Sequence, residues 1–364
     1  MNFSKLAIAM AVTLTSTAAS AQEHLHSLDA SQIDNAIPAG TDFYGHVNHK
    51  WQVANPLTPE HARYGKFNVL SDTSEVRIKN LVLGLAETNP QPGTVAFKVS
   101  TIYNQAMDSA RRNAEGAAPI QADLKRIEST PHDGMEELLF WMHKSYANPF
   151  FNVGFQEDLA NSSQYAMYVD GGGLGLGDRD YYLLNDQRNK EVREAYQKMI
   201  VKQLQNAGFK KKDAQRIMKN VIKIETAIAD STKTREESRD ITAMYNPRTL
   251  QQLSEQYPSV NWAKYIPATM GFEAPRNYIV TSPKTMAQAD KLLSTLTDRE
   301  IKDFYLWKYV AQAAGKLGDN FTDAAFEFSK VMSGVEQQKP RWKRALGATE
   351  GAMGEAIGQL YVEK

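Results

Sequence analysis

The sequence predicts a mainly α-helical protein with a small β element. Apolar residues recur at helical spacing along most of the chain, and the clearest set is Ile217, Val221, Ile224 and Ile228. These four fall on one face of a helix expected over about 210–235. Only a few short segments have the composition of strands, so helices dominate the expected fold.

Further helices are expected along the chain, and some carry start signals. Ser282 precedes Pro283 in the order of a cap residue and a first-turn proline, and Thr297 and Glu300 have capping-box spacing. The same periodicity predicts helices over residues 70–87, 94–113, 134–147, 189–207, 298–317 and 321–345. Strands are predicted over residues 150–156, 163–169 and 277–281.

Composition excludes one broad class of function. The 364 residues include 42 basic and 42 acidic side chains, so the formal net charge is zero. A nucleic-acid-binding protein usually carries a basic patch that neutralises phosphates, and we therefore expect no nucleic-acid partner. The chain has no cysteine, which leaves it without disulfides or thiolate ligands.

The N-terminal segment has the layout of a secretory signal peptide. Lys5 is followed by an apolar run from Leu6 to Leu14 and by the small residues Ala19, Ser20 and Ala21. We expect cleavage after Ala21, export to the periplasm and no membrane span in the mature chain, because the apolar run is too short to cross a bilayer. Residues 22–41 are polar without a sustained period and predict a flexible lead-in.

Metal and nucleophile motifs are missing from the sequence. A zinc-protease helix needs His-Glu-x-x-His, and no such motif occurs; none of the seven histidines lies after His143. His46 and His49 are three residues apart on a probable helix but have no evident third ligand, so we interpret them as surface residues. There is no Gly-x-Ser-x-Gly elbow. We therefore expect neither metal nor catalytic residues in this chain.

A glycine-rich stretch, residues 168–184, raises the question of phosphate binding. Its glycines at 171, 172, 173, 175 and 177 do not have the Gly-x-Gly-x-x-Gly spacing of a dinucleotide site, and the run ends in Asp178-Arg179-Asp180. Carboxylates at that point would repel a phosphate. The stretch instead predicts a backbone turn that needs positive φ and leads into a helix at "DRDYY".

Seven motifs occur in order along the chain from about residue 40 to its end. They are "DFYGHVNHKW" (42–51), "RYGKFNVLSD" (63–72), "GGLGLGDRDYYL" (172–183), "YNPRTLQQL" (245–253), "YLWKYVAQAAGKL" (305–317), "KPRWKRAL" (339–346) and "MGEAIGQLYVEK" (353–364). Together they resemble the N-terminal region of the neprilysin family of zinc metallopeptidases, in its bacterial oligopeptidase branch.

The resemblance implies a large multi-helix cap domain over residues 42–364. In the family this cap covers a thermolysin-like zinc domain, and the closed cavity between the two admits oligopeptides and excludes folded proteins. The zinc ligands and the transition-state histidine lie in the second half of the family's length. We therefore expect this chain to lack the zinc domain and, by itself, to hydrolyse nothing.

The resemblance also implies two substrate-binding residues. The arginine of the family's "RYG" motif holds the carboxylate at the C-terminus of the peptide, and it corresponds to Arg63. The phenylalanine four residues later lines the pocket beside the scissile bond, and it corresponds to Phe67. Ser71 stands where some relatives have a second arginine, and Asn68 where some have Asp. We therefore expect this chain to bind the peptide's C-terminal carboxylate more weakly than those relatives do.

Two other interpretations of the chain remain open at this stage. It could be a non-enzymatic exported protein that binds peptides, with the cap domain as the complete gene product. It could also be the product of a degraded gene, in which a wall that normally contacts the zinc domain exposes an apolar surface.

Overall fold

The computed structural model describes residues 30–363. The predicted signal peptide (1–21) and the first part of the lead-in (22–29) lie outside the described residues. The chain divides into two compact units, with the division between Leu57 and Thr58.

The first unit contains the short 3₁₀ helix η1 (Ala30–Gln32) and the helix α1 (Phe43–Ala54). The Asp42 side chain starts α1 by accepting a hydrogen bond from the Gly45 backbone N–H at 2.8 Å. His46 Nδ1 lies 2.8 Å from the carbonyl oxygen of Ile37, and His49 Nδ1 lies 2.6 Å from Asp34 Oδ2. Both histidines therefore tie residues 34–37 to α1.

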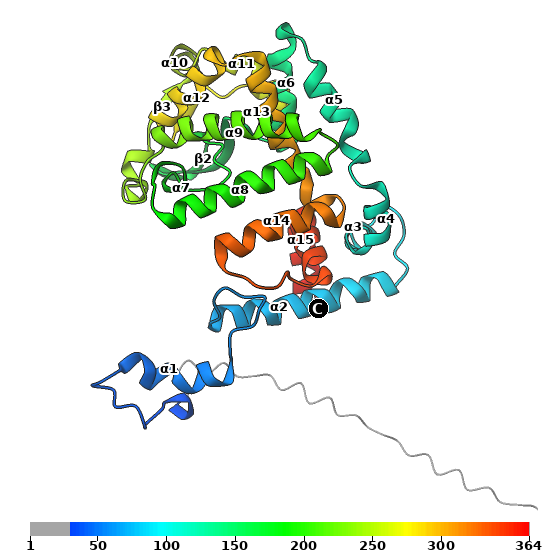
Figure 1. The fold of residues 1–364 in the computed structure, drawn as a ribbon, viewed down its shortest axis with the longest axis vertical. Coiled ribbons are helices and arrows are strands. Elements are labelled where there is room, and N and C mark those ends of the chain that lie inside the picture. Colours follow the sequence, from blue (N-terminus) through cyan, green and yellow to red (C-terminus); the bar gives the residue numbers. More distant parts are fainter. Residues whose placement is uncertain (1–29, 364) are drawn as a thin grey trace, which may run out of the picture. The chain divides into compact units, whose positions relative to one another are not determined.

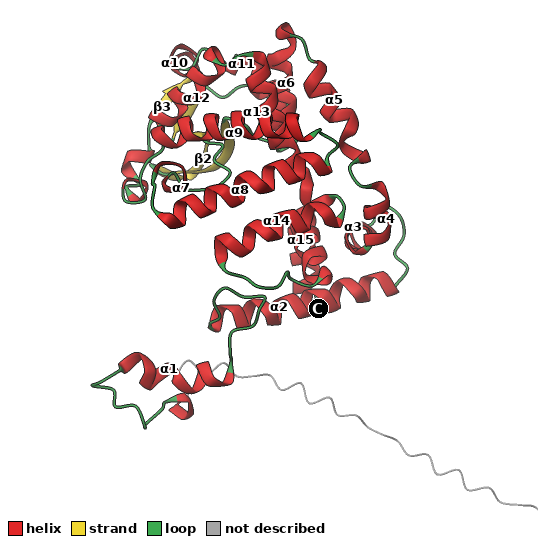
Figure 2. Cartoon of the chain, viewed as in Figure 1, coloured by secondary structure: helices red, strands yellow, loops and turns green. Residues whose placement is uncertain are grey.

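The second unit is built mainly of helices (Figures 1 and 2). Its α-helices are α2 (Lys66–Glu87), α3 (Val95–Met107), α4 (Ser109–Glu115), α5 (Gln121–Ser129), α6 (Met135–Lys144), α7 (Asp180–Leu183), α8 (Gln187–Asn206), α9 (Lys211–Ser231), α10 (Leu250–Gln256), α11 (Trp262–Met270), α12 (Pro283–Thr295), α13 (Asp298–Ala313), α14 (Asp319–Ser333) and α15 (Arg341–Val362). The mainly α fold class is confirmed.

A four-stranded sheet supplies the β element. Strands β1 (Phe151–Asp158) and β2 (Asn161–Gly171) form an antiparallel hairpin, and β4 (Asn277–Val280) pairs parallel to β2. The fourth strand, β3 (Pro247–Thr249), pairs antiparallel with β4 and gives the order β1-β2-β4-β3. The sequence did not predict β3, because three residues that begin with proline carry almost no strand signal.

The main hydrophobic core lies between the long helices and the sheet. The four periodic residues of α9 are all fully buried, as the sequence predicted. α9 packs against α8, α12 and α13, and α12 packs on β2. A second, smaller core joins α2, α3 and α15 through Leu81, Val82, Val99, Tyr103, Ala345, Leu346 and Ile357.

Two predicted helices are each interrupted in the structure. The segment 94–113 breaks at Asp108, whose side chain caps α4 by accepting from the Arg111 N–H at 3.0 Å. The segment 321–345 breaks at Gly334, where φ is +77°, and a new helix begins after Pro340. Apolar residues continue at helical spacing across both breaks, so the periodicity predicted one continuous helix in each segment despite the local signals for a helix end.

Candidate functional site

Arg63, the first substrate-binding residue expected from the sequence, lies in the segment that leads into α2. Its side chain is exposed. Within residues 30–363, its guanidinium group makes no hydrogen bond or ion pair with another side chain. An exposed cation without a protein partner keeps its full hydrogen-bonding capacity for a ligand.

The backbone around Arg63 is held in place from several sides. The carbonyl oxygen of Pro59 accepts hydrogen bonds from the backbone N–H groups of Glu336 and Gln337, each at 2.9 Å. The Tyr64 hydroxyl donates to Asp72 Oδ2 at 3.2 Å, and the His61 ring packs edge-on against the Tyr64 ring at 4.9 Å between centroids. Anchored neighbours on both sides of Arg63 restrict where its side chain can reach.

A charged cluster lies beside this segment. Lys343 Nζ of α15 contacts Asp72 at 2.8 Å, Glu75 at 3.2 Å and Glu60 at 3.9 Å. Burial raises the pKa of the Asp72 carboxyl, but the hydrogen bond and charge of Lys343 outweigh it and the net pKa is lowered. Arg63 forms no ion pair with this cluster in residues 30–363, so its guanidinium group is left to interact with solvent or ligand.

Phe67, the second expected residue, lies in the first turn of α2. Its side chain is 90% exposed, which is far more than is usual for a phenylalanine. The same turn shows why Asn68 fits here: its Oδ1 accepts a hydrogen bond from the Gly65 backbone N–H at 3.0 Å and so stabilises the start of α2. Ser71, one turn further on, is also exposed.

Arg63 and Phe67 are therefore both exposed near the start of α2, one with a cationic and one with an aromatic side chain. A guanidinium group can bind a carboxylate through two parallel hydrogen bonds, and an exposed aromatic ring can make apolar contacts. Together the two residue types are suited to a ligand that carries both a carboxylate and an apolar group.

The glycine-rich stretch forms a tight turn, in line with its sequence. Gly173 and Gly177 adopt φ values of +112° and +74°, and the chain then enters α7 at Asp180. Gly175 is needed for a different reason, because a Cβ there would lie 1.8 Å from the Tyr196 hydroxyl oxygen.

A buried polar network that the sequence did not predict lies beneath that turn. Glu225 of α9 is fully buried and accepts hydrogen bonds from Tyr182 at 2.7 Å and Tyr196 at 3.2 Å. Lys308 Nζ of α13 donates to the Gly173 carbonyl oxygen at 2.6 Å and lies 3.7 Å from Glu225 Oε1. Glu225 follows Val221 by four residues and precedes Ile228 by three, so the apolar period already placed it on the buried face.

The described residues do not fit a catalytic zinc ion. No group of three or more His, Asp or Glu side chains is arranged to hold a metal anywhere in residues 30–363. The same residues contain no helix that is both long and apolar enough to cross a bilayer.

The comparisons identify the family. Residues 39–364 match the model of peptidase family M13, which is most of the chain. The chain belongs to peptidase family M13. Human endothelin-converting enzyme 1 is 27% identical over 347 residues, covering 92% of this chain and 44% of that enzyme. Neprilysin-1 of Caenorhabditis elegans is 25% identical over 352 residues, covering 89% of this chain and 46% of the relative. The resemblance to the neprilysin family is confirmed.

Solved structures of family M13 have the same fold. The zinc metalloprotease Zmp1 of Mycobacterium tuberculosis, solved with an inhibitor, has a TM-score of 0.85 at 25% identity, covering 93% of this chain and 52% of that one. PepO from Lactobacillus rhamnosis has a TM-score of 0.76 at 18% identity, which shows the shared fold alone. The chain thus spans about half the length of the M13 proteins it matches, and it corresponds to their N-terminal helical domain.

Proposed function

We propose that this chain is the substrate-restricting N-terminal domain of an exported zinc metallopeptidase that cleaves oligopeptides. The observation that carries the proposal is the family match over residues 39–364, combined with coverage of less than half of each curated relative. In this proposal the zinc ion and the catalytic groups belong to a C-terminal domain. The predicted signal peptide at residues 1–21 supports export to the periplasm.

Arg63 and Phe67 are proposed to contact the peptide substrate. The Arg63 guanidinium binds the carboxylate at the peptide's C-terminus, and the Phe67 ring lines the pocket beside the scissile bond. The anchored backbone on both sides of Arg63 supports this role, because a fixed backbone loses less conformational entropy when the side chain binds.

Peptide binding to the purified chain tests the proposed role of Arg63. We expect a short apolar N-acetylated peptide with a free C-terminus to bind more tightly than its C-terminal amide. Arg63→Ala should remove that preference and weaken binding by about tenfold, the loss of roughly one charge-assisted interaction. Arg63→Lys should restore part of it, because lysine keeps the charge but not the planar fork. Arg77→Ala, an exposed arginine on α2, is the matched control. Equal binding of acid and amide would contradict the assignment.

Zinc analysis and peptide hydrolysis assays test whether zinc binding and catalysis belong to a C-terminal domain and not to this chain. We expect no stoichiometric zinc and no chelator-sensitive cleavage from residues 22–364 alone. Zinc at one ion per chain with turnover would contradict the proposal. A coding sequence that continues past residue 364 into a His-Glu-x-x-His motif would support it, whereas a stop codon with no such frame downstream would favour the non-enzymatic peptide-binding protein.

A further inference from the structure

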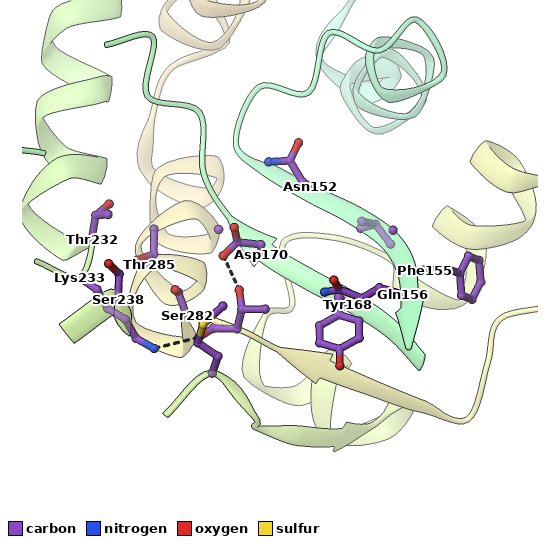
Figure 3. Close-up of a pocket in the computed structure, with 15 residues that line it drawn as sticks. Asn152, Phe155, Gln156, Tyr168, Asp170, Thr232, Lys233, Ser238, Ser282 and Thr285 are labelled. Carbon is purple, nitrogen blue, oxygen red and sulfur yellow. Dashed lines mark hydrogen bonds between the residues drawn. The ribbon is translucent and has the colours of Figure 1, made fainter. Parts of the chain in front are cut away.

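A cavity of about 550 Å³ lies on one face of the sheet in the second unit (Figure 3). Its floor is made by β1 and β2, and its walls by the chain that follows α9 and by the first turn of α12. Gly154 lies in the floor, and a side chain at that position would meet nothing within 4 Å. The volume is in the range of small-ligand pockets.

Strand alternation places polar groups on this face. Asn152 and Gln156 flank Gly154 on β1, and the register sets Asp170 opposite Asn152 and Tyr168 opposite Gly154. The Tyr168 hydroxyl already donates to the carbonyl oxygen of Glu157, so the cavity meets mainly the aromatic ring. The floor therefore combines open space, one carboxylate and one aromatic surface.

Two opposite charges line the cavity. Asp170 is the one carboxylate and Lys233 the one cation among its described lining residues. Thr281 lies between them: its hydroxyl donates to Asp170 Oδ1 at 2.5 Å, and its carbonyl oxygen accepts from Lys233 Nζ at 3.2 Å (Figure 3). Lys233 also donates to the Ala243 carbonyl oxygen at 3.1 Å. Within the part of the chain that is described, the two side chains do not form an ion pair with each other.

Both charged groups keep unused capacity. An ammonium group has three donors, and neutral carbonyl oxygens accept two of those of Lys233. A carboxylate can accept about four hydrogen bonds, and one neutral hydroxyl donates to Asp170. Burial raises the pKa of Asp170, and the Thr281 hydrogen bond and the Lys233 charge only partly oppose it. A cation that approached Asp170 would relieve that cost.

We propose that this cavity binds a small zwitterion, a free amino acid or a dipeptide, with its ammonium group at Asp170 and its carboxylate at Lys233. A simple anion would be repelled by Asp170 and a simple cation by Lys233, whereas a molecule with both charges satisfies both groups. The inference does not depend on the function proposed above, because Arg63 and Phe67 are not among the residues that line this cavity.

The start of α12 strengthens the carboxylate end of the site. Ser282 occupies the N-cap position without a side-chain capping bond, so its hydroxyl is available to a ligand. The first turn of a helix also carries partial positive charge, which adds to that of Lys233. Met244 and the Tyr168 ring supply apolar contact for the side chain of a dipeptide.

Calorimetric titration with glycyl-L-leucine tests the proposal. We expect saturable binding that is lost with N-acetylglycyl-L-leucine, which lacks the ammonium group, and with glycyl-L-leucinamide, which lacks the carboxylate. Asp170→Asn, which can still accept the Thr281 hydrogen bond, and Lys233→Met should each weaken binding by about tenfold or more. Glu157→Gln on β1 and Lys291→Met on α12 remove exposed charges and are the matched controls.

Arg63→Ala separates this site from the proposed substrate contact. Binding of glycyl-L-leucine that survives Arg63→Ala and fails in Asp170→Asn and Lys233→Met, with unchanged circular dichroism, supports the cavity. Loss of binding in Arg63→Ala alone would place the dipeptide at the start of α2 and overturn the proposal. Absence of saturable binding, or an affinity for the acetylated and amidated probes equal to that for glycyl-L-leucine, would overturn it as well.

Discussion

Substitution of Lys308 by methionine probes the buried network under the glycine-rich turn. The change keeps the length and apolar stem of the side chain but removes the charge that faces Glu225. Glu225 would remain fully buried with hydrogen bonds from two tyrosine hydroxyls, and the Gly173 carbonyl oxygen would lose its 2.6 Å donor. Breaking one side of a buried charge pair typically costs about 3–5 kcal/mol of unfolding free energy.

The pH dependence of this loss follows from the direction of the pKa shift. Burial raises the pKa of Glu225 in the folded chain, and the Lys308 charge opposes that shift. Without Lys308 the folded pKa rises further, so above the unfolded value near 4.5 the folded state holds a proton that the unfolded state releases. Stability of Lys308→Met should therefore be greatest below that value and fall as pH rises, by up to about 1.4 kcal/mol per pH unit until the folded pKa is passed.

Urea unfolding, followed by tryptophan fluorescence from pH 5 to pH 8, measures both effects. Glu225→Gln in the Lys308→Met background should recover stability and remove the added pH slope, because no buried charge is left. Lys316→Met removes an exposed lysine close by in sequence and should stay within about 0.5 kcal/mol of the parent chain. If the free energy of unfolding of Lys308→Met equals that of Lys316→Met at pH 8, the Glu225 network does not stabilise the glycine-rich turn.

Three further predictions concern single positions. Gly175→Ala should lower the free energy of unfolding by more than about 2 kcal/mol, because the added Cβ would displace the Tyr196 hydroxyl. Gly177→Ala faces open space and should lower it by about 1 kcal/mol, because its φ is positive. The urea unfolding midpoints of the two variants measure this difference. Burial lowers the pKa of His143 to about 3, so its ring NMR signals should not titrate between pH 8 and pH 4. The free energy of unfolding should fall as pH drops below 6.5, because the unfolded chain then binds a proton that the folded chain does not. An NMR titration midpoint near 6.5 would contradict this prediction. Thr297→Ala removes half of a capping box and should cost about 1 kcal/mol in thermal unfolding, while an unchanged midpoint would show that α13 needs no cap.

Elements with a strong apolar period could be predicted from the sequence. α9 is the clearest case, since one face of Ile and Val residues over about three turns has no other stable arrangement than burial against a core. Elements and boundaries that depend on one or a few residues were harder to predict. β3 is three residues long, and the breaks at Asp108 and Gly334 depend on one capping carboxylate and one positive φ. Such features change a boundary without changing the average pattern of the segment.

Buried charges were the least predictable feature of the core. Asp303 is fully buried on α13 and is paired with Arg216 of α9 at 3.1 Å and with Arg299 at 3.0 Å. In a sequence, an acidic residue on a helix is ordinarily read as solvated, because a lone buried carboxylate is unstable. Arg299 is four residues earlier on the same helix, but Arg216 lies 87 positions earlier, so that second ion pair becomes evident only from the packing of α9 on α13.

Arg63 could be proposed as a binding residue only from the family resemblance, and Lys233 only from the structure. Arg63 is an exposed arginine, and neither spacing nor period distinguishes it from Arg77 on the same stretch of chain. Lys233 lies in a run of charges, residues 233–240, that resembles a solvated helix end. Lys233 differs from the other cations of that run because it lies across Thr281 from the partly buried carboxylate of Asp170. This arrangement brings together β2 and the residues that directly follow α9 and β4. A contact that depends on three elements has no counterpart in any local pattern, so a site of this kind is found only once the sheet and its covering helices are in place.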